Sequence, residues 1–172
     1  MIKSKEPSLC PLCGGGLIYR DMRRRYLKNS QGEKKRFMLR RLKCEECKKL
    51  HTEIPYFIQP YKHYSSETIQ SVIDNNAGAG ECAADNSTIR RWKNGFSEAG
   101  PDISQRLASV YARMSNEPAT INQSASILKI IMNKNGRWLA FVMSLLINAG
   151  YKLRAQFAFC PSPLSARIQT VS

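Results

Sequence analysis

The sequence predicts an α+β fold, in which a β-hairpin that carries two cysteine pairs precedes an all-helical part. Three observations support this prediction. Two Cys-x-x-Cys motifs flank two runs that are rich in β-forming residues, and a turn signal separates these runs. Apolar residues then recur at helical spacing from residue 66 onward. A content of 42% hydrophobic residues is typical of a globular protein and not of a disordered chain.

The expected hairpin has strands over residues 17–28 and 35–43, in which β-forming side chains alternate with arginines and lysines. The segment Asn-Ser-Gln-Gly at 29–32 is a turn signal that reverses the chain between them. Successive side chains of a strand point to opposite faces, so the three consecutive arginines at 23–25 must reach both faces. At least one face of the hairpin is therefore expected to be strongly cationic.

The two cysteine pairs indicate a metal site formed by Cys10, Cys13, Cys44 and Cys47. Two residues between paired cysteines allow one tight turn to direct both sulfurs at one ion, and four thiolates suit tetrahedral zinc. We therefore expect a zinc ribbon with one structural Zn²⁺. A closed four-cysteine site leaves no open position for catalysis. Two alternatives stay open: His51 replaces a cysteine as ligand, or an iron–sulfur centre occupies the site.

A helix-turn-helix is expected after an extended connector over residues 51–64. Its helices are expected over residues 66–75, 80–84 and 88–97. Ser65 or Ser66 is the expected N-cap of the first helix and Ser87 that of the last, which Gly100-Pro101 should close.

The last of these helices has the pattern of a DNA-recognition helix. Ile89, Trp92 and Phe96 share one face, which should be core. The opposite face and the helix start provide six candidate DNA contacts: Ser87, Thr88, Arg90, Arg91, Lys93 and Asn94. Arginine can read guanine, asparagine can read adenine, and a hydroxyl can hold a phosphate. The alternative is an ordinary amphipathic helix with a solvated basic face.

The C-terminal part is expected to form three further helices, over residues 102–115, 121–133 and 137–149. The last is apolar nearly all round, which favours burial on more than one side and allows a homodimer or a protein partner. The expected division is a ribbon with connector at 1–64, a helix-turn-helix at 65–100, C-terminal helices at 101–150 and a flexible tail at 151–172.

The charge of the chain points to a polyanionic partner. The formal net charge is +14, and residues 1–64 contain 16 of the 27 Lys and Arg residues. The hairpin contributes seven candidate phosphate contacts: Arg23, Arg24, Arg25, Lys35, Arg36, Arg40 and Arg41. The alternative is a solubilising strand edge, on which charge blocks pairing with other chains.

Several classes of protein are disfavoured by the sequence. No apolar run reaches membrane-spanning length, and the N-terminus has no apolar signal segment. We therefore expect a cytoplasmic location without membrane contact, where cysteines stay reduced. Residues 101–172 contain only two carboxylates, Asp102 and Glu117, too few for a metal-dependent nuclease or transposase centre. We expect the chain not to be an enzyme.

Three segments resemble a known family: CPLCGG, RLKCEECKKLHTEIPYFIQPYKHYS and STIRRWKNGF. They resemble uncharacterised bacterial proteins with a domain of unknown function, in which a zinc ribbon precedes a helix-turn-helix and which are often found near insertion-sequence transposases. The likeness covers residues 8–100 and extends to the N-terminal DNA-binding half of such transposases. It implies that the four cysteines are the ligands and that residues 87–94 lie in the recognition helix.

These observations together predict a zinc-dependent DNA-binding protein, a transposon-associated or regulatory factor without a catalytic core. The alternatives are an RNA-binding zinc-ribbon protein and a protein-interaction module that docks a transposase or a polymerase.

Overall fold

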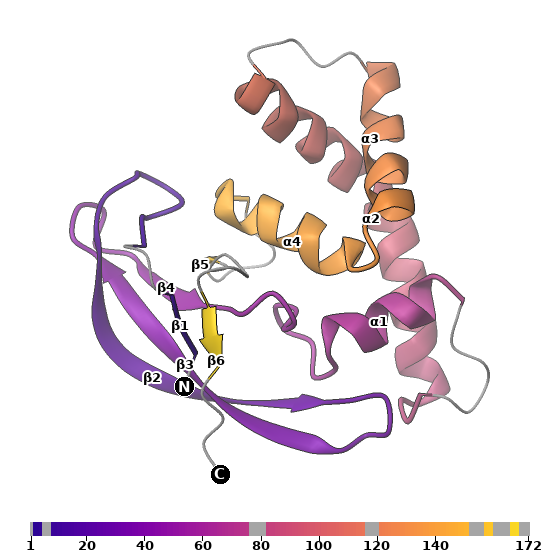
Figure 1. Ribbon diagram of the computed structural model, residues 1–172, viewed down its shortest axis with the longest axis horizontal. Coiled ribbons are helices and arrows are strands. Elements are labelled where there is room, and N and C mark those ends of the chain that lie inside the picture. The colour runs from indigo at the N-terminus through magenta and orange to yellow at the C-terminus, as the bar shows by residue number, and fades with distance from the viewer. Residues whose placement is uncertain are drawn as a thin grey trace.

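A computed structural model describes residues 2–4, 8–75, 82–115, 121–151, 157–159 and 166–168. The fold is α+β, as expected. A long, curved β-hairpin runs along one side of the molecule, and the helices gather on its concave side (Figure 1).

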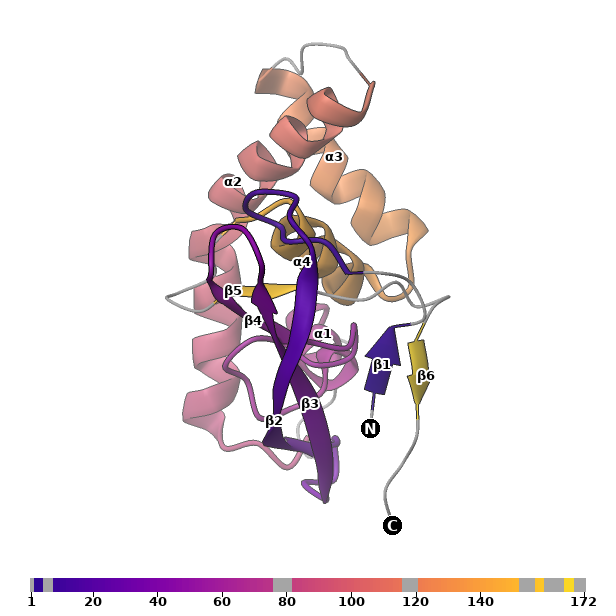
Figure 2. The ribbon, with the colours of Figure 1, turned by 90° about the vertical axis from the view of Figure 1, so that its left-hand side faces the viewer.

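The hairpin lies at one edge of a four-stranded sheet. Its strands are β2 (Leu17–Lys28) and β3 (Lys34–Cys44), which agree closely with the expected strands. The connector begins as strand β4 (Leu50–Glu53), antiparallel to β3, and β5 (Phe157–Phe159) pairs with β4 in parallel. A separate pair joins β1 (Ile2–Ser4) to β6 (Ala166–Ile168), and Figure 2 shows this pair beside the hairpin.

The predicted turn closes the hairpin through the side chain of Asn29. Its Oδ1 accepts a hydrogen bond of 2.9 Å from the backbone N–H of Glu33, and its own N–H donates to the Glu33 carbonyl at 3.1 Å. Asparagine is favoured in turns because its side chain makes such local bonds. The turn sets the register, in which Lys28 pairs with Lys34.

The register of the hairpin shifts once, near the cysteine end. Tyr19 pairs with Leu42, whereas Asp21 pairs with Arg41, so Arg20 is an extra residue on β2. Such a β-bulge bends the strand, increases its twist and shifts the alternation of side chains between the two faces by one residue.

In the part of the chain that the structure describes, four helices follow: α1 (Ser66–Ile73), α2 (Asn86–Ser115), α3 (Ile121–Lys134) and α4 (Trp138–Asn148). Ser65 is the N-cap of α1, because its hydroxyl accepts a hydrogen bond from the backbone N–H of Thr68. The bounds of α3 and α4 agree with the expected helices to within one residue. No described helix has the length and apolarity needed to cross a membrane.

The expected break at Gly100-Pro101 was wrong, because α2 is one helix of 30 residues with Pro101 inside it. Proline removes the hydrogen bond to the carbonyl four residues earlier. Ser97 and Pro101 are both exposed, so water can bind the freed carbonyl. The apolar stripe continues past this point through Ile103 and Leu107, and this packing holds the two halves in one helix.

The expected short helix near 80–84 is not present at residues 82–84, which form bends, while 80 and 81 lie outside the described residues. Helix α2 begins at Asn86, two residues before the start expected at residue 88. Ser87 therefore lies inside the helix and is not its N-cap. Asp85 caps the helix instead, because its carboxylate accepts a hydrogen bond from the backbone N–H of Thr88. Within the described residues α1 and α2 are joined without the expected middle helix.

Among the described residues, two hydrophobic clusters hold the fold together. The larger unites α1, α2, α3 and α4 around Trp92 and Trp138, and the predicted core residues Ile89 and Phe96 pack against it. The smaller is formed by Leu27 and Leu39 of the hairpin, Ile54 and Ile58 of the connector, and Ile147 of α4. Ile147 therefore fixes the hairpin to the helical part.

Residues 151–172, expected to be a tail, contribute the strands β5 and β6. No pattern in the sequence predicted either strand. Immediately before this segment, Gly150 has φ +82°, and a Cβ atom there would lie 2.5 Å from the carbonyl oxygen of Pro11. Only glycine allows the end of α4 to approach the first cysteine pair this closely.

Candidate metal centre and nucleic-acid interface

The two cysteine pairs meet at one end of the hairpin. The four Sγ atoms of Cys10, Cys13, Cys44 and Cys47 all lie within 4.8 Å of one another. The distance is 3.7 Å between the sulfurs of Cys10 and Cys47, and 3.5 Å between those of Cys13 and Cys44. A tetrahedron with metal–sulfur bonds of about 2.3 Å has edges of about 3.8 Å. The cluster therefore has the size of a four-thiolate metal site.

Backbone hydrogen bonds form the two turns that carry the cysteines. In the first turn Gly14 N–H donates to the Cys10 carbonyl at 2.8 Å, and in the second Cys44 N–H donates to the Lys49 carbonyl at 2.9 Å. Gly15 lies between the turns, where a Cβ atom would be 2.4 Å from Cγ of Glu46 and 3.2 Å from Sγ of Cys44. The absence of a side chain at Gly15 lets the turns approach.

The environments of the thiols differ. Desolvation raises the pKa of Cys10 to about 12, whereas the backbone N–H of Gly15 and the side chain of Cys44 lower the pKa of Cys13 to about 7. Cys10 and Cys44 are buried and Cys13 is exposed. A metal ion binds the thiolate forms, so its binding displaces protons from the cysteines, above all from Cys10.

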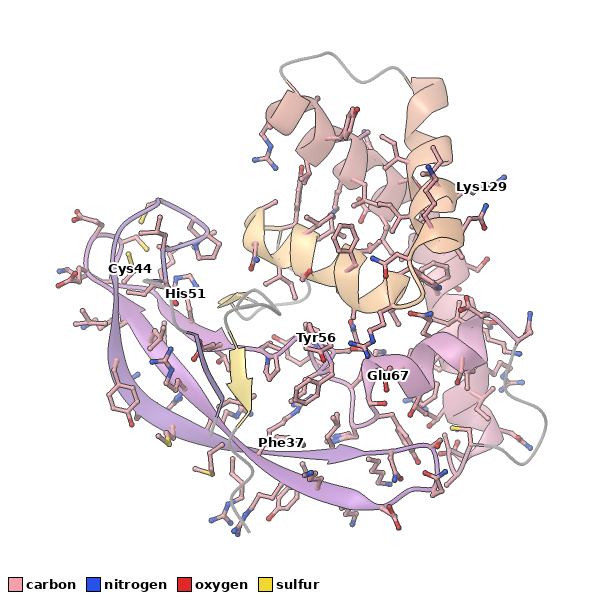
Figure 3. All side chains as sticks on the ribbon, in the orientation of Figure 1. Phe37, Cys44, His51, Tyr56, Glu67 and Lys129 are labelled. Atoms are coloured by element: carbon pink, nitrogen blue, oxygen red, sulfur yellow. The ribbon has the colours of Figure 1, made fainter. Side chains whose placement is uncertain are left out.

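His51 lies beside the cluster rather than in place of a cysteine. Strand β4 places its imidazole in the interior with 0% exposure, and Nε2 lies 3.3 Å from Sγ of Cys10. Figure 3 shows His51 and Cys44 close together at the cysteine end of the hairpin. Burial lowers the pKa of His51, with a smaller contribution from Lys49. The imidazole is therefore neutral at pH 7 and can donate one N–H to a sulfur.

Four of the seven predicted hairpin cations are exposed to solvent. They are Arg23, Arg24, Lys35 and Arg36. Lys34, also on the hairpin, is exposed as well, and so are Arg20 and Lys43, which the sequence did not single out. Arg20 and Lys43 belong to the same basic runs of sequence, which could have identified them.

The other three predicted hairpin cations make contacts within the protein. Nη2 of Arg25 donates to the Lys62 carbonyl at 2.7 Å. Arg40 forms a bidentate ion pair with Glu53 at 2.5 and 2.9 Å, and the side chain of Glu53 has 0% exposure. Arg41 forms a second bidentate pair, with Asp21. These contacts stabilise the hairpin and favour a structural role for the three arginines.

At the start of α2 the six predicted contacts fall into two groups. Asp85, which the sequence did not single out, accepts hydrogen bonds from the hydroxyls of both Ser87 and Thr88. Its carboxylate occupies the helix N-terminus, where a phosphate would otherwise bind. The remaining residues are exposed: Arg90, Arg91, Lys93 and Asn94. Lys93 also donates to Oδ1 of Asn75 at 2.6 Å.

The fold and the cysteine cluster define an α+β protein with a candidate four-cysteine metal centre. Residues 10–92, which run from the first cysteine to the buried Trp92, match a family described as a domain of unknown function (DUF6431). No curated protein and no solved structure matches the chain.

Proposed function

We propose that this chain is a DNA-binding protein whose N-terminal hairpin is held by one structural zinc ion. Four converging thiolates are the donor set that structural zinc prefers, and the sulfur separations fit its tetrahedral geometry. Such an ion would link the chain just before β2 to the chain at the end of β3, and its binding would supply folding free energy. With four protein ligands it has no position for a substrate, so its role is structural.

The surface charge of the hairpin is the observation that carries the DNA-binding proposal. Arg23, Arg24, Lys35 and Arg36 are exposed on neighbouring strands. The two acidic residues in this part of the chain are already engaged, Asp21 with Arg41 and Glu33 with Asn29. Lysines and arginines greatly outnumber carboxylates on the hairpin, and this excess of positive charge attracts the phosphates of a nucleic acid. The exposed Arg90, Arg91 and Asn94 of α2 add side chains that suit base edges.

In this proposal the chain acts by binding alone, in the cytoplasm, as a regulatory or transposon-associated factor and not as an enzyme. A single observation favours a second candidate function, the docking of a protein partner. Ile130 of α3 and Phe141 of α4 are 51% and 43% exposed, so the C-terminal helices present apolar side chains to solvent.

The salt dependence of duplex binding tests the proposal. Binding of fluorescein-labelled random-sequence duplex DNA is measured by anisotropy at several salt concentrations, with the wild type, the variant Arg24→Gln/Arg36→Gln and the control Lys129→Gln. Lys129 is exposed on α3, far from the hairpin (Figure 3). Each lost phosphate contact should lower the slope of log K against log salt by about 0.9.

The expected result is a lower slope for the hairpin variant and a slope equal to the wild type for Lys129→Gln. Two outcomes contradict the proposal. One is no binding at low salt, and the other is an equal loss of slope in both variants.

A further inference from the structure

The β-bulge at Arg20 brings two tyrosines onto one face of the hairpin. Tyr19 and Tyr26 are seven residues apart, so in a regular strand they would point to opposite faces. Arg20 is an extra residue, so the bulge shifts the alternation by one and brings both tyrosines to the same face. The pairing with β3 shows this, because directly paired residues of antiparallel strands share a face. One face is thus defined by the following pairs: Tyr19 with Leu42, Met22 with Arg40, Arg24 with Met38, Tyr26 with Arg36, and Lys28 with Lys34.

The β2 side of this face is open to solvent and carries, in order, Tyr19, Met22, Arg24 and Tyr26. Tyr19 is 55% exposed, Met22 38% and Tyr26 47%. Arg24 lies between the two tyrosines on β2, and Arg36 is opposite Tyr26 on β3. The opposite face of the same part of the hairpin packs into the core through Leu27 and Leu39. Around residues 22–28 the exposed face is therefore the outer, convex one, whereas near the cysteines its β3 side is buried at Leu42.

Protection of a strand edge does not account for the tyrosines. Charged side chains alone prevent an edge strand from pairing with other chains, and β2 already has four arginines at 20 and 23–25. Two half-exposed rings work against such protection, since they add apolar surface. Aromatic rings with arginines between them are instead the combination that binds unpaired bases and their phosphates.

We propose that this face binds single-stranded DNA, with bases stacked on Tyr19 and Tyr26 and phosphates held by Arg24 and Arg36. The inference rests on the proposed DNA-binding function and specifies its substrate. Duplex DNA offers phosphates to the arginines, but its bases stack on one another and present no free face to a tyrosine ring.

The distance between the rings suits this substrate. At about 3.4 Å per residue, the strand from Tyr19 to Tyr26 spans roughly 20 Å once the bulge is allowed for. A DNA strand rises about 3.4 Å per nucleotide in a duplex and more when extended, so the face accommodates several nucleotides between the two stacking sites.

The test compares two fluorescein-labelled probes on the full chain at low salt: an oligothymidine of about 16 nucleotides, and a random-sequence duplex of similar length. The variants are Tyr19→Ala, Tyr26→Ala and Tyr26→Phe, with Tyr111→Ala as matched control. Tyr111 is 54% exposed on α2, away from the hairpin. Circular dichroism and zinc content establish that each variant keeps the wild-type fold.

Each alanine variant should weaken oligothymidine binding about 5- to 100-fold, because a base–aromatic stack contributes on this scale. The ring of Tyr26→Phe should preserve affinity, and duplex binding should change less than about twofold in all variants. Tyr111→Ala should bind both probes like the wild type.

Three results overturn the inference. If the chain binds the duplex but not oligothymidine, the proposed function stands and the single-stranded substrate is wrong. If the alanine variants weaken both probes equally, or not at all, the tyrosines do not stack on bases. If neither probe binds, the proposed function fails and the inference fails with it.

Discussion

Nε2 of His51 lies 3.3 Å from Sγ of Cys10, and the side chain of His51 is completely buried. A neutral imidazole with its proton on Nε2 donates that proton to the Cys10 thiolate. This hydrogen bond disperses negative charge from a buried sulfur and fixes its direction. Groups that orient a metal ligand in this way commonly change metal affinity when they are removed.

His51→Leu is therefore expected to lower zinc affinity about 10- to 100-fold. Competition with a chromophoric chelator measures this directly. The matched control is His63→Leu, because His63 is an exposed histidine in the same connector. Equal zinc affinities in the two variants would show that His51 does not act on the metal centre.

The buried ion pair between Arg40 and Glu53 should make the hairpin sensitive to the loss of either partner. Glu53→Ala leaves the guanidinium of Arg40, which is 13% exposed, without its partner. Loss of one partner of a buried pair costs about 3–5 kcal/mol. We expect this decrease in the free energy of unfolding in urea. Replacement of both residues by leucine should cost less, since it leaves no uncompensated charge. A double variant less stable than Glu53→Ala would contradict this interpretation.

The N-cap of α2 by Asp85 predicts how the stability of the fold depends on pH. The hydroxyl of Ser87 and both the N–H and the hydroxyl of Thr88 lower the pKa of Asp85 to about 2, compared with about 3.9 in an unfolded chain. A carboxylate with a lowered folded-state pKa stabilises the protein above the unfolded value, and this stabilisation is lost as the pH falls toward the folded value.

Asp85→Ala should thus lower the urea midpoint of unfolding at pH 6. The difference in midpoint between the variant and the wild type should become smaller as the pH falls below about 4. The comparison is made at matched zinc content, so that loss of metal affects both proteins alike. A difference that stays constant between pH 6 and pH 3 would show that Asp85 does not cap the helix as a carboxylate.

The exposed arginines of α2 should govern sequence preference rather than overall affinity. Once a preferred duplex has been selected, Arg91→Ala should relax specificity at one base position by about 1–3 kcal/mol. Binding competitions with single-base variants of that duplex measure the change, and Arg90→Ala is tested in parallel. If affinity falls by the same factor for every sequence, the helix contacts phosphates and does not read bases.

Much of the N-terminal part was predictable because local signals agree with one another there. The spacing of the cysteines, the turn at Asn29 and the alternation of residues 17–43 all specify one hairpin, and the structure confirms it. The helical face of Ile89, Trp92 and Phe96 was likewise confirmed, because a helix with one apolar stripe must bury it.

The wrong predictions arose where tertiary packing overrides local preference. Gly100-Pro101 usually ends a helix, but burial of Ile103 and Leu107 on the same side as Trp92 continues α2 through it. The roles of Arg25, Arg40 and Arg41 depend on partners 13 to 37 residues away in the chain, such as Glu53. Composition counts every arginine as a free cation and does not reveal these partners.

The shared face of Tyr19 and Tyr26 was also not predictable from the sequence. Strict alternation places them on opposite faces, and only the register of the folded hairpin reveals the bulge at Arg20. The pairing of β5 with β4 is equally non-local, since it joins residues about a hundred positions apart.

Zinc content measured together with duplex DNA binding, on the wild type and on Cys44→Ser, tests the central claim most directly. Cys44 is fully buried at the end of β3, so its loss removes a ligand at the end of the hairpin opposite the turn. We predict about one zinc per wild-type chain with salt-sensitive DNA binding, and the loss of both in Cys44→Ser. A wild-type chain that binds no zinc, or a zinc-free Cys44→Ser protein that binds DNA as tightly as the wild type, would contradict the account.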